Sequence, residues 1–243
     1  MSTTPQDLES LRRRLYASYA SDHAGEGDTA LESAWCQRYV HPFMPADRQS
    51  NVIDIGCGQG AAVRSLADIG YVNASGIDRS PEQVELARAA GTVNVHHGDF
   101  RHFIGRQTGS LDGVLALDLL EHLTKDEVLE TFDAVRAALR PGGVFVARVP
   151  NAASPFGGRI RYGDFTHESS FTARSLRQLC LVTDLGLPQV YDSAPISGDV
   201  RGLLRARAWP ILAAAMRVAL AIESGRGGDN YVAQNIVMVT YRP

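Results

Sequence analysis

The sequence predicts an α/β fold in which helices cover both faces of a doubly wound, mostly parallel sheet. From Asn51 onward, short apolar runs rich in β-branched residues alternate with segments of helical hydrophobic period. The first run leads directly into three alternate glycines, a turn typical of a strand that feeds a helix. A chain of 243 residues with 44% hydrophobic and 21% charged content is long enough for one domain of this class.

Two helices are expected before the sheet. The first has leucines and a tyrosine at helical spacing within residues 8–19, and the second spans 31–40 and ends before Pro42. We expect both to cap a cleft in the domain. The polar, Arg-rich start of the chain lacks the apolar run of a secretory signal, which predicts a cytoplasmic protein.

The remaining elements follow in alternation. The predicted strands are 52–55, 72–77, 93–96, 113–117, 144–148, 189–192 and 235–241, and the predicted helices between them are 61–69, 81–90, 125–139 and 175–184. Parallel strands joined in this way place a ligand outside their carboxyl ends, where the strand order reverses.

The stretch NVIDIGCGQG (51–60) sits at that point. Gly56, Gly58 and Gly60 lack the Cβ atoms that would block a close backbone approach to a nucleotide-like cofactor. The next strand ends at Asp78, eighteen residues after Gly60, where a carboxylate can accept both hydroxyls of a ribose. Asp54 would repel a pyrophosphate but suits a cationic or zwitterionic ligand.

The D-I-G-C-G-Q-G form resembles motif I of the class I S-adenosylmethionine-dependent methyltransferases. Further segments between Gln49 and Phe171 are similar to later motifs of that family and come in the same order: GIDRSPEQVELAR, NVHHGDF, DGVLALDLLEHL and LRPGGVFVARVP. The resemblance implies a Rossmann-like sheet of seven strands in the order 3-2-1-4-5-7-6, with the last strand antiparallel.

The same resemblance implies S-adenosylmethionine as the cofactor. Asp78 would bind the ribose hydroxyls, Asp99 would meet the adenine amino group, and Phe100 would pack near the ring. The cofactor-binding residues expected in this way are Asp54, Gly56, Cys57, Gly58, Gly60, Asp78, Arg79, Asp99, Phe100 and Leu117.

An alcohol acceptor must lose a proton during methyl transfer, which calls for a base or a divalent cation. Asp118, Glu121 and His122 would share one face of a helical turn and could bind Mg²⁺ or Mn²⁺. The arrangement resembles the E-x-x-E-H of metal-dependent small-RNA 2′-O-methyltransferases and related quinone-ring O-methyltransferases, with Asp118 replacing the first glutamate. In the small-RNA enzymes a downstream histidine completes the site, and His167 is the candidate here.

A metal-free interpretation stays open. Glu121 and His122 would then cap the helix that follows the fourth strand, and His167 would act as the catalytic base. His167 lies in the long segment 150–171, whose length favours a lid or an acceptor site.

The segment 150–171 resembles methyltransferases of bacterial surface-polysaccharide assembly. That likeness implies an O-methyltransferase acting on a hydroxyl of a saccharide or similar polyol. Alternatives are a quinone precursor or other small metabolite, an RNA 2′-hydroxyl, and a non-catalytic cofactor-binding module.

We expect one domain over 1–243, composed of a helical cap (1–45), a cofactor-binding core (49–195), a helical insertion (196–230) and a last strand (231–243). Apolar residues and four arginines alternate in 199–225, which favours a cleft cover or homodimer contact over peripheral attachment to the inner face of an anionic membrane. The net charge of −3 gives no case for nucleic acid, and three widely spaced cysteines predict neither disulfides nor a zinc site.

Overall fold

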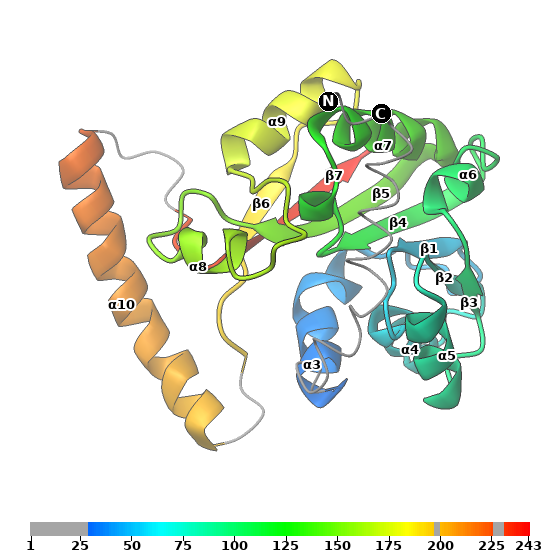
Figure 1. Cartoon of the computed structure of the whole chain (residues 1–243), viewed down its shortest axis with the longest axis horizontal. Coiled ribbons are helices and arrows are strands. Elements are labelled where there is room, and N and C mark those ends of the chain that lie inside the picture. Colours follow the sequence, from blue (N-terminus) through cyan, green and yellow to red (C-terminus); the bar gives the residue numbers. More distant parts are fainter. Residues whose placement is uncertain (1–28, 197–199, 226–230) are drawn as a thin grey trace, which may run out of the picture.

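The computed structural model of the chain describes residues 29–196, 200–225 and 231–243 (Figure 1). Seven strands form one sheet in the order β3-β2-β1-β4-β5-β7-β6, with only β7 antiparallel to its neighbours, which confirms the predicted topology. The strands are β1 (Val52–Ile55), β2 (Ala74–Asp78), β3 (Val95–His97), β4 (Leu111–Leu117), β5 (Leu139–Pro150), β6 (Gln189–Asp192) and β7 (Asn235–Tyr241).

The helices described match the prediction except for two short additions. They are α3 (Thr29–Tyr39), α4 (Ala61–Asp68), α5 (Pro81–Ala89), α6 (Phe100–Ile104), α7 (Lys125–Ala138), α8 (Gly157–Arg161), α9 (Ala173–Val182) and α10 (Val200–Ser224), with 3₁₀ turns η1 (His41–Phe43) and η2 (Leu120–His122). Helices α6 and α8 were not expected, since five residues are too few to show a period. The helix expected within 8–19 lies outside the described residues.

Side-chain caps fix where the helices of the site begin. Ser80 accepts a hydrogen bond from the Gln83 amide and is followed by Pro81, so α5 begins directly after β2. Thr124 and Glu127 form a capping box at the start of α7. These caps hold the loops after β2 and β4 close to the ends of their strands.

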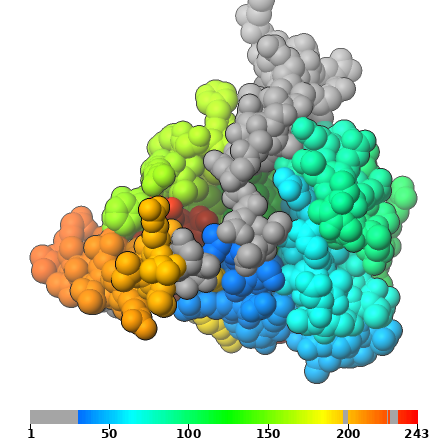
Figure 2. All heavy atoms as spheres, turned by 90° about the horizontal axis from the view of Figure 1, so that it is seen from below, coloured from blue at the N-terminus to red at the C-terminus, as the bar shows by residue number. Residues whose placement is uncertain are grey.

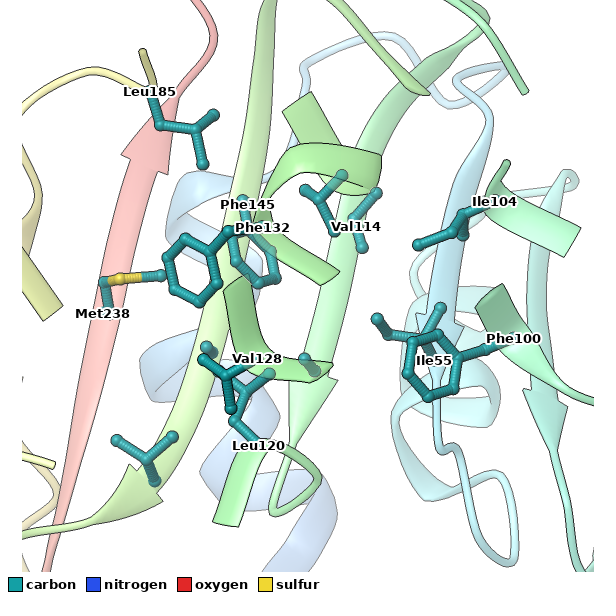
Figure 3. Close-up of a cluster of buried hydrophobic side chains, with 14 of the residues drawn as sticks. Ile55, Phe100, Ile104, Val114, Leu120, Val128, Phe132, Phe145, Leu185 and Met238 are labelled. Atoms are coloured by element: carbon teal, nitrogen blue, oxygen red, sulfur yellow. The ribbon is translucent and has the colours of Figure 1, made fainter. Parts of the chain in front are cut away.

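The sheet has an apolar cluster on each face. Trp35, Val63 and Leu66 belong to the cluster under α3, α4 and α5. The other cluster lies under α6, α7 and α9, and Figure 3 shows Phe132 packed on Phe145, with ring centroids 5.4 Å apart and near-perpendicular planes. Burial on both faces explains why the strands read as continuous apolar runs.

Helix α10 lies apart from the sheet at one end of the molecule (Figures 1 and 2). It is one helix from Val200 to Ser224 with Pro210 in its interior. The Arg217 guanidinium donates a hydrogen bond to the Asp192 carboxylate at 2.7 Å, and Ala213 of the same helix is buried. Among the described residues, no helix has the length and apolar character needed to cross a bilayer.

Candidate active site

A cleft of about 830 Å³ opens at the carboxyl ends of β1, β2 and β4, where the strand order reverses. Nine of the ten predicted cofactor-binding residues line it; the exception is Gly60. Helix α3 contributes Glu32, whereas none of the described residues of α10 reaches the cleft. Helix α3 therefore forms part of the cleft wall. Of the two packing roles expected for the insertion, a cleft cover or a homodimer contact, its described residues do not provide the cover.

Gly60 has a structural role in place of the predicted contact. It is the N-cap of α4 with φ of 71°, and a Cβ there would lie 2.9 Å from the Thr92 side chain. Gly56 has φ of 69° and faces Leu119, which a Cβ would meet at 2.8 Å. Both glycines therefore allow a left-handed, tightly packed turn.

Asp78 ties this turn to the end of β2. One carboxylate oxygen accepts the Gly58 amide at 2.8 Å, and the other accepts the Ser80 amide at 2.8 Å. Burial raises the pKa of Asp78 above its usual value, while these amide bonds act in the opposite direction. Carboxylate oxygens have further lone pairs, so the side chain can still accept the hydroxyls of a ribose.

Asp54 is the buried acid of the cleft. Its side chain is 3% exposed, and Oδ1 has no hydrogen-bond partner among the described residues. Burial, followed by the charge of Asp78, raises the pKa of Asp54 well above its usual value. A cationic amino group in the cleft would supply the missing partner.

Asp99 lines the cleft but is already engaged. It caps α6, and both carboxylate oxygens accept bonds from the Arg101 guanidinium, at 2.8 and 3.1 Å. Hydrogen bonding by Arg101 lowers the pKa of Asp99, and Arg101 also pairs with Glu127 at 3.1 Å. An adenine amino group would share this carboxylate with Arg101, and that contact stays a prediction.

Asp118 differs from its predicted role as a metal ligand. Arg148 binds it at two points, Nε to Oδ1 at 2.8 Å and a terminal nitrogen to Oδ2 at 2.5 Å. Arg148 also pairs with Glu32 at 3.4 Å and stacks on the Trp35 ring at 4.2 Å. The predicted ligand set therefore loses Asp118, whose carboxylate neutralises a buried guanidinium.

The other three predicted ligands do come together. Glu121, His122 and His167 each offer one ligand atom, and these atoms lie within 4.8 Å of one another. The segment that carries Glu121 and His122 is a 3₁₀ turn, Leu120–His122, and Asp118 lies before it with φ of 54°, so the three residues do not share one helical turn. Ligand atoms that each lie about 2.1 Å from one ion are at most about 4.2 Å apart. The observed limit of 4.8 Å is only slightly larger, so small side-chain rotations would bring the three atoms onto one ion.

Glu121 is the buried carboxylate of this cluster. Its side chain is 2% exposed, and Oε2 has no hydrogen-bond partner among the described residues. Burial, with a smaller contribution from Asp118, raises the pKa of Glu121 well above its usual value. A buried acid without a partner is the feature that a cation would satisfy, so the donor set fits a divalent metal.

Hydrogen bonds fix the tautomers of both histidines. His167 Nδ1 lies 3.0 Å from the Ile160 carbonyl oxygen, which can only accept. His122 Nδ1 lies 2.8 Å from Thr166 Oγ1, which itself donates to Asp164 at 2.7 Å. In the neutral form of each ring these contacts favour the proton on Nδ1, which leaves Nε2 with the lone pair that a metal requires.

The electrostatics agree with ligation by a neutral His122 imidazole. Burial, followed by the charge of His167, lowers the pKa of His122 to about 4, so His122 is neutral at physiological pH. The two rings meet edge to face with centroids 4.7 Å apart. His167 is buried in this contact, with only 10% of its side chain exposed, and is no freely solvated loop residue.

The backbone holds the His167 loop against η2. The amides of Glu168 and Ser169 both donate to the Glu121 carbonyl, at 2.7 and 3.1 Å. Sequence reasoning missed Thr166 and Arg148 as parts of this site. An arginine inside the apolar strand VFVARVP was the available signal, because a charge there needs a buried partner.

Comparisons with known proteins agree on the fold and the class of chemistry. The family model described as "Methyltransferase domain" matches residues 29–187. The ubiquinone biosynthesis O-methyltransferase of Xanthomonas oryzae pv. oryzae is 33% identical over 99 residues, which cover 39% of this chain and 40% of that protein. The protein of the same name from Xanthomonas axonopodis pv. citri is 31% identical over 155 residues, covering 55% and 64%.

The chain thus spans about two fifths of the first of these relatives. Two solved structures share its fold at low identity. A SAM-dependent methyltransferase from Archaeoglobus fulgidus has a TM-score of 0.67 at 18% identity, covering 92% of this chain and 98% of that one. A possible histamine N-methyltransferase from Thermotoga maritima has a TM-score of 0.64 at 13% identity, covering 95% and 100%.

Proposed function

Because the chain belongs to the methyltransferase domain family, whose cofactor is S-adenosylmethionine, we propose that it methylates a hydroxyl oxygen with the help of a divalent metal. The single observation that carries this proposal is the convergence of Glu121, His122 and His167, within 4.8 Å, beside a cleft that His122 also lines. The proposed cofactor position has Asp78 at the ribose and Asp54 at the amino group.

In the reaction, a lone pair of the acceptor oxygen forms a bond to the methyl carbon while the carbon–sulfur bond breaks. The electron pair of that bond stays on sulfur and gives S-adenosylhomocysteine, and the hydroxyl proton leaves to a base. Glu121, His122 and His167 would hold the divalent ion, which would supply Lewis acidity and so lower the pKa of the hydroxyl. Thr166 and Ile160 hold the two imidazoles in the ligating tautomer.

Two classes of acceptor are candidates. The sequence led us to a saccharide or similar polyol hydroxyl, whereas the names of the curated relatives favour an intermediate of ubiquinone biosynthesis. Tyr162 and Phe165, which are exposed and flank the His167 loop, suit either class, since aromatic side chains stack on quinone rings and on sugar faces. The acceptor is decided by experiment.

The test is transfer of labelled methyl from S-adenosylmethionine to a catechol and to a polyol, after chelation and again after adding Mg²⁺ or Mn²⁺. We expect transfer to stop with chelator and return with metal, and Glu121→Gln to lower the rate by roughly 10²-fold or more. Glu130→Gln, an exposed carboxylate change on α7, is the matched control. Chelator-resistant transfer would contradict the metal and leave His167 as the base.

Metal binding needs its own readout. Calorimetric titration with Mn²⁺ without cofactor or acceptor should show one site in the wild type, lost in Glu121→Gln. Asp118→Asn should retain it, since Asp118 is bound to Arg148. Equal loss in both variants would return Asp118 to the ligand set.

A further inference from the structure

Helix α10 carries an apolar stripe on its exposed side, and Arg207 lies at its edge between the second and third of its residues. We define the stripe by its five large apolar residues, which are between 59% and 79% exposed: Val200, Leu204, Ile211, Val218 and Ile222. At 3.6 residues per turn they fall within a sector of about 40°. Ala213 and Arg217, which contact the rest of the chain, lie on the opposite half of the helix.

The stripe is symmetric about Ile211. Leu204 and Val218 lie seven residues before and after it, and Val200 and Ile222 lie eleven before and after. In an antiparallel pair of α10 helices centred on Ile211, each stripe residue would therefore face an apolar residue of the other copy. This self-complementarity is what a two-fold symmetric contact requires, because the same surface must serve both partners.

The charges of α10 favour the same orientation. Arg201, Arg205 and Arg207 lie near its start, and Glu223, the only acid of the helix, lies near its end. An antiparallel pair brings Glu223 beside Arg201 of the second copy at both ends of the contact. A parallel pair would place the two sets of arginines together, at a cost in like-charge repulsion.

We propose that α10 is a homodimerisation helix, which pairs antiparallel with α10 of a second copy through the stripe, with its two-fold axis at Ile211. The spacing of seven between Leu204, Ile211 and Val218 is that of helices packed along one seam. An anionic membrane surface would also accept an apolar face with arginines, but it does not require symmetry about one residue. The inference does not depend on the acceptor or on the metal.

Cysteine pairing tests the geometry in the full-length chain. The three natural cysteines are buried, so cysteines placed on α10 would react without competition. Ile211→Cys should form an intermolecular disulfide on mild oxidation, because residue 211 meets its own symmetry mate. Leu204→Cys should not, since its mate would be about 21 Å away, at 1.5 Å per residue.

A chain that carries both Leu204→Cys and Val218→Cys should again form an intermolecular disulfide, because residue 204 of each copy would face residue 218 of the other. Efficient pairing of Leu204→Cys alone would indicate a parallel contact and overturn the proposed arrangement. Absence of a link with Ile211→Cys would overturn the pairing itself.

Sedimentation tests the association without cross-linking. We expect the wild type to dimerise with a dissociation constant between about 1 and 100 μM, and Ile211→Arg to be at least tenfold weaker, because it places two charges at the axis. Its thermal unfolding should match the wild type, as residue 211 is exposed in the single chain.

Two outcomes would contradict the dimer. A wild-type chain that stays monomeric throughout this range would overturn it. So would a monomer that binds phosphatidylglycerol vesicles and loses that binding in Ile211→Arg, since a lipid surface would then be the partner of the stripe.

Discussion

Arg148 and Asp118 form a two-point ion pair that joins β5 to the residue that follows β4. The guanidinium is largely buried, with 12% of its side chain exposed, and the Asp118 backbone has φ of 54°. Asp118 therefore adopts a left-handed conformation in which its carboxylate reaches Arg148. Both residues line the cofactor cleft, so the pair holds the loop after β4 against β5 at the cleft wall.

The first prediction concerns the stability that this pair contributes. Asp118→Asn, which tolerates the left-handed backbone, should lower the free energy of unfolding by about 1–3 kcal/mol, because a buried guanidinium loses its main partner. Urea unfolding measures the change. Arg140→Gln, which breaks the more exposed Arg140–Asp112 pair, should cost less than about 1 kcal/mol. Equal effects would show that burial does not strengthen the Arg148 pair.

The second prediction concerns the ribose contact. Asp78→Asn keeps one acceptor but loses the charge and one of the two backbone-amide bonds, so affinity for S-adenosylmethionine should fall by roughly 10–100-fold. Calorimetry measures the change. Glu85→Gln, an exposed carboxylate change on the neighbouring α5, is the control. Unchanged affinity in Asp78→Asn would remove Asp78 from the cofactor site.

The third prediction is that the Asp54 carboxyl lowers the stability of the fold at neutral pH while it strengthens cofactor binding. The pKa of Asp54 is raised in the folded state. At a pH between the ordinary and the raised pKa, the folded chain therefore still binds a proton that the unfolded chain has already released. Stability from this group is therefore present at low pH and is lost as the pH rises through that range. At neutral pH the free energy of unfolding of Asp54→Asn should be about 1 kcal/mol higher than that of the wild type. The same variant should bind the cofactor more weakly.

The matched control for Asp54 is Asp112→Asn. Asp112 is equally a buried acid, but it pairs with Arg140 and accepts the Asn51 amide at 2.6 Å. Its replacement should lower stability at neutral pH. Urea unfolding at pH 5 and pH 8 distinguishes the two variants, and a loss of stability in Asp54→Asn at both values would contradict the argument.

The fourth prediction concerns the support of His122. Thr166→Val removes the hydroxyl that joins His122 to Asp164, so the imidazole loses the partner that fixes its tautomer. We expect affinity for Mn²⁺ to fall about 10–100-fold. Thr166→Ser keeps the hydroxyl and should bind nearly as the wild type does. If Thr166→Val binds Mn²⁺ with wild-type affinity, His122 does not ligate through a fixed Nε2.

The sheet could be predicted from the sequence because its signals are local. The ends of β1, β6 and β7 match residue for residue. β1 and β7 are short runs of mostly apolar residues, and β6 has Val190 and Tyr191 between polar ends. The order of the strands came from the family resemblance. Helices α6 and α8 were missed because one turn and a half carries no period.

The site was harder to predict where it depends on distant partners. The sequence correctly indicated that Glu121, His122 and His167 lie together, yet Asp118 was assigned to the same cluster because spacing alone cannot show that Arg148 binds it. The 3₁₀ turn at Leu120–His122 changes the direction of these side chains, and tertiary hydrogen bonds to the His167 loop decide that turn.

The position of β7 has a consequence for folding during synthesis. The strands β1 to β4 with their glycine turn can assemble as soon as they leave the ribosome, because each pairs with a neighbour close in sequence or already made. Strand β6 cannot pair until β7 emerges, since β7 lies between β5 and β6. A nascent chain therefore exposes the β5 edge late in translation, which makes that interval the one most prone to aggregation.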